Sequence, residues 1–389
     1  MSKNKAMVLA AGLGTRLRPL TDLISKPMAP IVNKPVMEHI IELLAKYGFT
    51  EIVCNLHWYP EDIKNYFGDG SKWGVSIAYS YEDKLLGTAG GVKNVEDFFE
   101  ERTFLVISGD ALTDIDLESL IEFHKEKSCI STIVLTRVED TSQYGVVLLD
   151  KDNKIYGFQE KPLGGEAESS LANSGIYVFE PKILKYVPEG KFYDFGKNLF
   201  PDLLKKKISY YGYVHNQYWN DVGSLSEYQR GNFDALERKV KVKIPGKMIK
   251  EGVWIGKNCK IQEDVIIIPP VCIGNNCTIK KGAKLFGPII LGDNTIVDER
   301  AVMYRGIKWG SGYIGKDTSL IGAIIGYDAK IKNKASILEK AVIGSRSIIE
   351  DGIVIHPSVK IMSDETVNND KLNVKDKDID IGKQKKEKI

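Results

Sequence analysis

The chain has 389 residues, enough for two or three domains, and its 43% hydrophobic and 27% charged residues are typical of a soluble globular protein. Its 54 basic and 52 acidic residues leave a net charge of +2, so composition gives no broad electrostatic case for a nucleic acid or a membrane surface as partner. Five scattered cysteines without a CxxC pair argue against a disulfide framework or a zinc site and favour a cytoplasmic location.

The first apolar run, residues 6–11, follows two lysines and therefore resembles the start of a signal peptide. The run is short, and Arg16 and Arg18 follow at once, so we interpret it as the first strand of a domain. No other apolar stretch reaches the roughly 20 residues that a membrane-spanning helix requires.

Residues 1–238 alternate β-rich runs with helical patterns, which predicts an α/β domain with a mostly parallel sheet covered on both faces. Helices are expected at 36–47 and 117–127, the second with Asp116 as its N-cap. Ligands of such sheets gather at the carboxyl ends of the strands, so we expect the site there. The expected strands are 5–11, 51–56, 75–81, 103–108, 131–136, 145–150, 174–180 and 210–214.

From about residue 249, aliphatic residues recur every six positions, which is typical of a parallel β-helix. Glycines at intervals of eighteen residues suggest three flat faces per coil with glycine at a corner, and the pattern breaks around residues 308–313. We expect a β-helix domain over 239–362, after a catalytic domain over 1–238, and a charged tail over 363–389 with no assigned function. The expected inward positions are Ile249, Ile255, Ile261, Ile267, Ile273, Ile279, Leu285, Leu291, Val297, Met303, Ile314, Leu320, Ile325, Ile331, Ile337, Ile343, Ile349, Ile355 and Ile361.

A glycine loop follows the first expected strand. Gly12 and Gly14 fit the beginning of a dinucleotide fingerprint, but Leu17 stands where its third glycine belongs, and no P-loop sequence is present. Glycines let a backbone approach a phosphate, and Arg16 and Lys26 add cations that suit a triphosphate. The alternative is an ordinary strand-to-helix turn with a solvated basic loop.

Two aspartates follow apolar or aromatic runs and are candidate Mg²⁺ ligands. Asp110 comes three residues after the end of the run 104–107, where a carboxylate can hold a metal ion against phosphates, although such a residue is often only a turn former. Asp221 is the second candidate. Its alternative role is the N-cap of a helix around 225–236, which Ser224 could provide instead.

The stretch GLGTRLRPLT at 12–21, followed by Lys26-Pro27, resembles the signature of the sugar-1-phosphate nucleotidylyltransferases, the nucleotide-sugar pyrophosphorylases. The resemblance covers nearly the whole chain except the tail, and the combination of motifs is highly specific. Ser25 departs from the pattern, since many members have proline there, and this predicts a less rigid loop before Lys26. The further matching motifs are LGTAGG (86–91), SGDALTDID (108–116), Tyr144-Gly145, Glu160-Lys161-Pro162, Asn173-Ser174-Gly175 and WNDVG (219–223).

The resemblance implies a Rossmann-like nucleotidyltransferase domain with a mixed, mostly parallel sheet, followed by a left-handed parallel β-helix of hexapeptide repeats. It also implies nucleotidyl transfer from a nucleoside triphosphate to a sugar 1-phosphate, with Mg²⁺ as cofactor. The implied catalytic residues are Arg16, Lys26, Asp110, Lys161 and Asp221, the aspartates also being metal ligands. The implied nucleotide-binding residues are Leu9, Ala11, Gly12, Gly14, Thr15, Glu82, Gly87 and Thr88, and the implied sugar-binding residues are Gly145, Glu160 and Asn173.

The segments 86–91, 192–204 and 218–229 most resemble mannose-1-phosphate guanylyltransferases, which favours GTP and mannose 1-phosphate. Relatives that use UTP, dTTP or ATP with glucose 1-phosphate share the scaffold and stay as alternatives. Two further alternatives are a non-catalytic regulatory subunit and a bifunctional enzyme with an acyltransferase in the β-helix, where His356 is the only histidine. The flat faces of a β-helix also predict a homo-oligomer.

Overall fold

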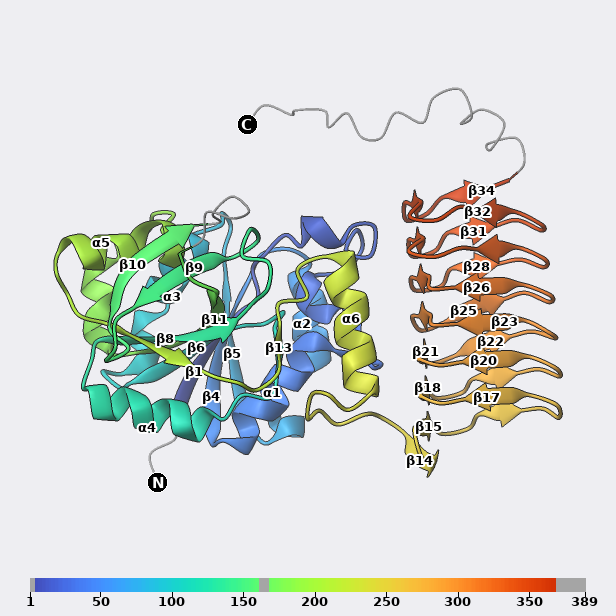
Figure 1. Ribbon diagram of the computed structural model, residues 1–389, viewed down its shortest axis with the longest axis horizontal. Helices are drawn as coiled ribbons and strands as arrows, with labels where there is room; N and C mark the ends of the chain where they lie inside the picture. The colour runs from blue at the N-terminus through green and yellow to red at the C-terminus, as the bar shows by residue number, and fades with distance from the viewer. Residues whose placement is uncertain (1–3, 161–167, 369–389) are drawn as a thin grey trace. The chain divides into compact units, whose positions relative to one another are not determined.

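The computed structural model describes residues 4–160 and 168–368 (Figure 1). The chain forms two compact units. The first contains the residues up to 17 together with 24–243, and the second contains 18–23 together with the residues from 244 onward. No helix in the described ranges is long and apolar enough to cross a membrane.

One mixed sheet organises the first unit. Among the described residues, nine strands pair in the order β10-β9-β11-β6-β1-β4-β5, with β8 beside β11 and β12 beside β8. β1 is parallel to both β4 and β6, whereas β9, β10 and β11 bring in the antiparallel pairs. All eight predicted strands are present, and β10 is an additional one. The strands are β1 (Asn4–Leu9), β4 (Phe49–Leu56), β5 (Ser76–Tyr81), β6 (Phe104–Ser108), β8 (Ser131–Arg137), β9 (Gly145–Leu149), β10 (Ile155–Glu160), β11 (Leu171–Phe179) and β12 (Tyr211–Val214).

Helices cover both faces of this sheet, as predicted. Val8 of β1 packs with α1 and α2, while the next residue toward the N-terminus, Met7, packs with α3 and α5 on the other face. The helices are α1 (Val36–Lys46), α2 (Pro60–Phe67), α3 (Gly87–Lys93), α4 (Leu117–Lys127), α5 (Phe200–Lys205) and α6 (Leu225–Leu236). The two-residue strands of this unit are β2 (Pro30–Ile31), β3 (Lys34–Pro35), β7 (Leu112–Thr113) and β13 (Trp219–Asn220).

Two helix N-caps clarify the sequence predictions. The Asp116 carboxylate accepts hydrogen bonds from the backbone N–H groups of Glu118 and Ser119, at 3.0 and 3.3 Å, so Asp116 caps α4 as predicted. The Ser224 hydroxyl accepts one from Glu227 N–H at 3.2 Å. Ser224 therefore caps α6, and this removes the helix-capping alternative for Asp221.

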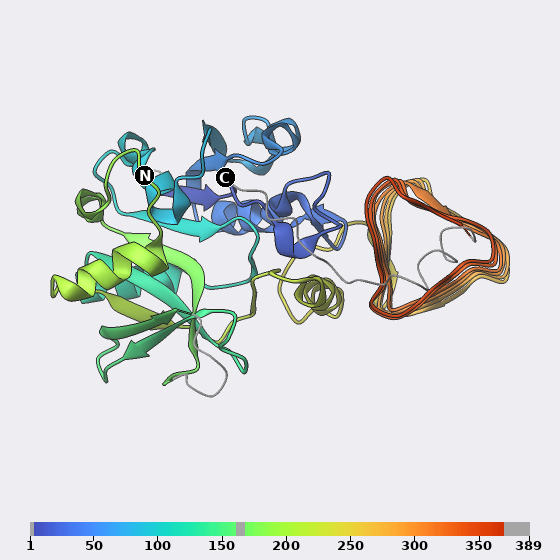
Figure 2. The ribbon, with the colours of Figure 1, turned by 90° about the horizontal axis from the view of Figure 1, so that it is seen from above.

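The second unit is a parallel β-helix whose coils stack into three sheets, seen end-on as a triangle in Figure 2. The first sheet contains β14 (Lys247–Lys250), β15 (Val253–Ile255), β18 (Val271–Ile273), β21 (Ile289–Leu291), β24 (Ile307–Lys308), β27 (Ile324–Ile325), β30 (Val342–Ile343) and β33 (Lys360–Ile361). The second contains β16 (Lys260–Ile261), β19 (Thr278–Ile279), β22 (Thr295–Val297), β25 (Gly312–Ile314), β28 (Lys330–Ile331), β31 (Ile348–Ile349) and β34 (Thr366–Val367). The third contains β17 (Ile266–Ile268), β20 (Lys284–Phe286), β23 (Val302–Tyr304), β26 (Ser319–Ile321), β29 (Ser336–Ile337) and β32 (Val354–Ile355).

The six-residue period marks the inward positions correctly from Ile273 onward, because these residues form one buried cluster. The prediction for Ile249 is wrong: its side chain is 57% exposed, because β14 pairs antiparallel to β15 as a flanking strand and not as a coil. At the predicted break, the inward position belongs to Lys308, which pairs with Leu291 and Ile325 in the ladder. Lys308 is fully buried.

Close stacking of the coils explains the corner glycines. A Cβ on Gly256 would lie 2.6 Å from the carbonyl carbon of Gly274 in the next coil, and a Cβ on Gly326 would lie 2.7 Å from the nitrogen of Ser345. Real side chains do not approach backbone atoms this closely. The glycine interval of eighteen residues therefore reflects a steric requirement of the corner.

Candidate active site

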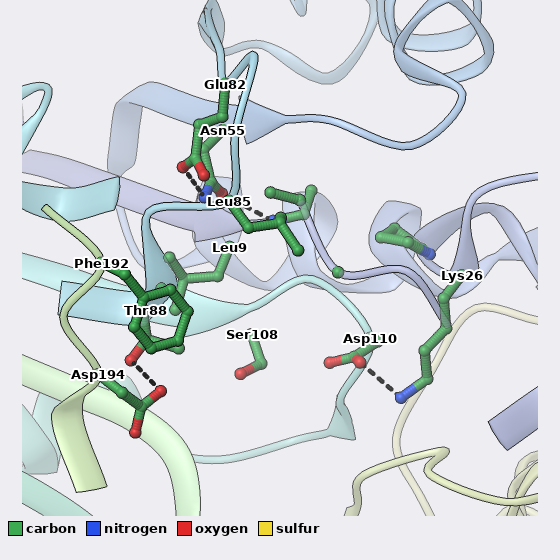
Figure 3. A pocket seen from close by; sticks show the side chains of 15 residues that line it. Leu9, Lys26, Asn55, Glu82, Leu85, Thr88, Ser108, Asp110, Phe192 and Asp194 are labelled. Atoms are coloured by element: carbon green, nitrogen blue, oxygen red, sulfur yellow. Dashed lines mark hydrogen bonds and ion pairs between the residues drawn. The ribbon is translucent and has the colours of Figure 1, made fainter. Parts of the chain in front are cut away.

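A cavity of about 320 Å³ lies at the carboxyl ends of β1, β4 and β6, where the parallel sheet predicts a ligand (Figure 3). Eight of the predicted site residues line it: Leu9, Ala11, Gly12, Lys26, Glu82, Gly87, Thr88 and Asp110. The other lining residues are Ala10, Pro27, Asn55, Leu85, Ser108, Phe192 and Asp194.

A buried lysine joins three distant segments at this cavity. Lys26 lies on a short 3₁₀ helix (Lys26–Met28), and its Nζ donates to Asp110 Oδ2 at 2.5 Å and to the backbone carbonyl of Asp221 at 3.3 Å. The Lys26 side chain is 10% exposed and the Asp110 side chain 29%, so the pair faces the cavity from a largely desolvated wall. The structure thus brings together Lys26, Asp110 and the backbone of Asp221.

The turn that carries Asp221 is strained. Val222 is buried and has a φ of 46°, a left-handed conformation that is a genuine outlier for a β-branched residue. Asp221 Oδ1 accepts hydrogen bonds from Gly223 N–H at 3.0 Å and from the Tyr144 hydroxyl at 3.5 Å. Burial, reinforced by the Asp221 carboxylate, raises the pKa of Tyr144, so this hydroxyl stays a donor.

The glycine loop leaves open space beside the cavity. No atom lies within 4 Å of the position that a Cβ on Gly12 would take, so a ligand can approach the backbone there. Gly14 has a φ of 64° and begins a turn into the 3₁₀ helix Thr15–Leu17, on which Arg16 is exposed. Gly14, Thr15 and Arg16 do not line the cavity, in contrast to Gly12 and Lys26.

The segment 191–195 is bound by its backbone to residues 86–90, which are the N-cap and first turn of α3. Ala89 N–H and Gly90 N–H both donate to the carbonyl of Tyr193, at 3.0 and 2.9 Å. Thr88 Oγ1 donates to Asp194 at 2.9 Å. Gly87 has a φ of 73°, and a Cβ there would lie 2.6 Å from the Tyr193 carbonyl oxygen. The glycine is thus needed for this close backbone contact.

This contact holds an exposed aromatic ring at the cavity. Phe192 is 62% exposed, yet the residue after it is hydrogen-bonded to residues 86–90 through both its N–H and its carbonyl. Figure 3 shows the Phe192 ring beside Thr88 in the wall of the cavity. An exposed, fixed aromatic ring offers a flat apolar surface for a planar ligand group.

Glu82 has a positioning role in the structure. Its Oε1 accepts from Asn55 Nδ2 at 2.8 Å, and its Oε2 accepts from Leu86 N–H at 2.9 Å. Asn55 Oδ1 in turn accepts from Ala10 N–H at 2.9 Å. Both carboxylate oxygens of Glu82 are therefore engaged in joining the strand end of β4 to residues 86–90.

Two segments that the sequence motifs single out, 173–175 and the one with Trp219, contact each other beside the same cavity. The Asn173 side chain accepts from Gly175 N–H at 3.0 Å and donates to the Tyr177 hydroxyl at 3.0 Å, within an irregularity of β11. A Cβ on Gly175 would lie 2.6 Å from Oγ of Ser108, which lines the cavity. Trp219 Nε1 donates to the Ser174 carbonyl at 2.8 Å.

The structure describes the other residues predicted to bind the sugar phosphate only in part. The Trp219 and Tyr144 rings lie 5.4 Å apart, which brings the segment before Gly145 next to Asp221. Gly145 begins β9, and its ladder partner in β10 is Glu160. Lys161 lies outside the described residues, and Glu160 is described only by its backbone.

Three site residues were missed by sequence reasoning. Asn55 interrupts the apolar run of β4 one residue before its end, and this polar residue in a buried strand was an available signal. Phe192 and Asp194 lie in the segment 192–204, whose family resemblance was noted without a role for either residue. Asp194 contacts Thr88 across 106 residues of chain, a tertiary contact that no local pattern indicates.

The departure at Ser25 leaves the local backbone in a conformation that suits proline. Ser25 has φ −70° and ψ 148°, values that proline also adopts. The serine is therefore compatible with the conformation that the stiffer residue of other members favours before Lys26.

Comparison with known proteins identifies the family. Residues 5–238 match the nucleotidyl transferase family, and residues 252–287 match the bacterial transferase hexapeptide family (six repeats). A UTP–glucose-1-phosphate uridylyltransferase of Synechocystis sp. is 44% identical over 278 residues, covering 68% of this chain and 72% of that protein. A mannose-1-phosphate guanyltransferase of Candida albicans is 36% identical over 265 residues, covering 66% and 71%.

A solved structure supports the same assignment. The crystal structure of HddC from Yersinia pseudotuberculosis complexed with GMP-PN has a TM-score of 0.51 and 28% sequence identity, covering 59% of this chain and 98% of that protein.

Proposed function

Since the chain belongs to the nucleotidyl transferase family, we propose that it is a sugar-1-phosphate nucleotidylyltransferase. An oxygen of the sugar 1-phosphate attacks the α-phosphorus of a nucleoside triphosphate, and pyrophosphate leaves. Such transfers depend mainly on positioning and charge stabilisation. The observation that carries the proposal is the Lys26–Asp110 pair, which faces the same cavity as the open backbone at Gly12.

Cations of this chain stabilise the charge that develops on the leaving pyrophosphate. Lys26 acts from a largely desolvated wall, where electrostatic interactions are stronger than in water. Arg16 is an exposed residue two positions beyond Gly14, and its planar guanidinium binds outer phosphate oxygens once the nucleotide lies along the loop. Lys161 binds the phosphate of the sugar, as the family resemblance implies, with Glu160 on the sugar hydroxyls.

Asp110 and Asp221 fit a divalent cation, and we assign Mg²⁺ to them. Carboxylate oxygens are the ligands that Mg²⁺ prefers, and the cation is usually held by one or two of them together with substrate phosphates and water. No group of three or more His, Cys, Asp or Glu side chains gathers in the described ranges. Substrate phosphates and water would supply the remaining ligands of a cation held by Asp110 and Asp221. When bound, the cation neutralises charge on the phosphates.

The nucleotide base lies in the part of the cavity formed by Leu9, Gly87, Thr88 and Phe192. We favour GTP as the nucleotide and mannose 1-phosphate as the sugar. The resemblance of segments 86–91, 192–204 and 218–229, the Candida relative and the GMP-PN complex of HddC support this choice. The product is then GDP-mannose.

A second candidate is UTP with glucose 1-phosphate. The Synechocystis relative, at 44% identity, supports it, and the same scaffold and the same catalytic residues serve both reactions. The choice depends on a few hydrogen bonds to the base edge, which can discriminate strongly.

Pyrophosphate release tests the function directly. Purified protein with Mg²⁺ is assayed across GTP, UTP, dTTP, CTP and ATP against mannose, glucose and N-acetylglucosamine 1-phosphates. A dominant rate with GTP and mannose 1-phosphate supports the first candidate, and one with UTP and glucose 1-phosphate supports the second. Absence of turnover in every combination contradicts the enzymatic proposal and favours a non-catalytic regulatory subunit.

We also propose that the chain forms a homo-oligomer through its β-helix. Outward residues of the third sheet stack in one ladder row, Ile268, Phe286, Tyr304 and Ile321, and two of them are about half exposed: Ile268 at 49% and Tyr304 at 46%. An apolar row on a flat face suits a self-complementary contact. Light scattering should show a smaller particle for the Ile268→Glu/Tyr304→Glu variant, and an unchanged mass would contradict this surface.

A further inference from the structure

A second cavity, of about 350 Å³, lies at the other end of the strands from the candidate active site. Its lining residues lie before β8, after β11, and before or at the first residue of β12. Phe179, the last residue of β11, pairs with Phe104 and Ser131, which are the first residues of β6 and β8. The candidate active site instead follows the far end of β6. The five residues of β6 separate the two ends by about 17 Å, and the cavities share no lining residue.

The charged side chains that line this cavity are all lysines in the described part of the chain. Lys127, Lys182 and Lys185 line it, and no aspartate or glutamate is among its described lining residues. Lys127 Nζ lies 3.6 Å from Glu126, while Lys182 and Lys185 form no ion pair with a carboxylate in the described part of the chain. Three ammonium groups with this little compensation attract an anion.

A fourth lysine adds to the same charge. Lys185 Nζ lies 5.0 Å from the centroid of the Tyr186 ring, and Lys206 Nζ lies 5.1 Å from it. Tyr186 also lines the cavity, together with Tyr211, whose ring centroid is 5.8 Å from Lys127 Nζ. Lys127, Lys185 and Lys206 therefore each lie close to one of the two aromatic rings that line the cavity.

The wall of the cavity is suited to binding and not to nucleophilic chemistry. Cys129 lines it with Sγ 3.6 Å from His124 Nδ1, and His124 Nε2 lies 3.2 Å from Glu180. Burial, however, raises the pKa of the Cys129 thiol, and the thiol donates to the Ser131 carbonyl at 3.2 Å. A neutral, engaged thiol is a poor nucleophile.

We propose that this lysine cavity, lined by Lys127, Lys182, Lys185, Tyr186 and Tyr211, binds a phosphate monoester of sugar or nucleotide size. Ammonium groups are compact point charges that suit a phosphate dianion. A volume of about 350 Å³ exceeds what the phosphate alone requires and lies in the range of small-molecule sites. The tyrosine rings supply a surface for a sugar or base. This site is additional to the proposed function and does not depend on it.

Calorimetry on the full-length chain without Mg²⁺ tests this site with three probes: glucose 6-phosphate, AMP and inorganic phosphate. We expect saturable binding of at least one monoester, weakened about tenfold or more in Lys182→Ala/Lys185→Ala, since two of the three lining charges are removed. The matched control is Lys64→Ala/Lys151→Ala, which removes the same charge from exposed positions outside the cavity. Binding to this control should equal that of the unmodified chain.

The probes also identify the recognised group. Tighter binding of glucose 6-phosphate or AMP than of inorganic phosphate supports recognition of the ester as a whole, and equal binding supports a site that recognises the phosphate alone. The proposal is overturned if no probe binds, if Lys182→Ala/Lys185→Ala binds as the unmodified chain does, or if both double variants weaken binding equally. Since no turnover is measured, these outcomes are independent of the nucleotidyltransferase assay.

Discussion

In the first unit, Gly12 follows β1 with no atom within 4 Å of the position that its Cβ would take, whereas a Cβ on Gly274, after β18 of the β-helix, would lie 2.6 Å from the nitrogen of Asp293. Both residues follow an apolar strand, and both belong to a recognisable sequence pattern. The first glycine leaves room for a ligand, and the second leaves room for the next coil. The same residue type therefore borders open space beside a cavity in one unit and permits close packing of coils in the other.

The two units also differ in how they bury lysine. Lys26 pairs with the Asp110 carboxylate in the wall of a cavity. Lys308 lies inside the β-helix with its Nζ within hydrogen-bond distance of three backbone carbonyls, those of Trp309, Ser311 and Gly326, at 2.6, 2.5 and 2.9 Å. The first lysine therefore lines a cavity, and the second contacts the backbone of an irregular coil.

The largest expected effect concerns Asp110, the partner of Lys26 in the proposed active site. Asp110→Ala should lower the rate of pyrophosphate release about 10²- to 10³-fold or more, because it removes a proposed metal ligand and leaves Lys26 without its partner. Steady-state kinetics measure this, with circular dichroism to confirm folding. The matched control, Asp152→Asn in an exposed turn, should retain activity, and a folded Asp110→Ala variant with normal turnover would refute the assigned role.

Lys308 should give the β-helix a pH-dependent stability. Burial lowers the pKa of Lys308 from 10.5 to about 7. Between these values the unfolded chain binds a proton that the folded chain does not, so the free energy of unfolding should rise with pH by up to about 1.4 kcal/mol per unit. Below about pH 7 this contribution should level off.

Urea unfolding between pH 7 and 10 tests the expectation for Lys308. Lys308→Met should flatten the rise, whereas Lys330→Met, which removes an exposed lysine from β28 of the same β-helix, should keep it. Parallel pH profiles for the two variants would show that Lys308 does not titrate in this range.

The variants Gly274→Ala and Gly12→Ala test whether glycine has different roles in the two units. Gly274→Ala should destabilise the β-helix by about 1–3 kcal/mol through overpacking and leave the kinetic constants of the folded enzyme unchanged. Gly12→Ala should fold normally and raise KM for the nucleotide, because its methyl group enters the ligand space. Thermal unfolding measures the loss of stability, and nucleotide titration measures the change in KM. A loss of stability in Gly12→Ala would contradict the proposed difference between the two glycines.

The smallest expected effect concerns the aromatic ring in the cavity wall. Phe192→Ala should raise KM for the nucleoside triphosphate about 5- to 20-fold with little change in kcat, because stacking on a base stabilises binding by about 1–2 kcal/mol. Phe192→Tyr should retain most of the affinity. Tyr156→Ala is the control, since Tyr156 is equally exposed at 62% but does not line the cavity. Equal KM values for the two alanine variants would exclude a role in base binding.

Periodicity alone determined much of this protein. The alternation of strands and helices predicted the sheet covered on both faces, α4 with its Asp116 cap, and a β-helix with inward aliphatic residues from Ile273 onward. These features depend on residues close in sequence or at a fixed interval, where hydrophobic burial and capping act locally. Gly12 and Asp110, two of the predicted site residues, line the cavity at the carboxyl ends of the parallel strands.

Tertiary structure alone decided what meets at these strand ends. Lys26 reaches Asp110 across 84 residues and the Asp221 carbonyl across 195, and no local pattern encodes such contacts. The same holds for Phe192 in the cavity wall and for the lysines around the second cavity. It also holds for Lys308, which points inward because the coils shorten there from eighteen to seventeen residues. Chain packing sets these positions, because side chains far apart in sequence become neighbours only when the whole sheet or coil has formed.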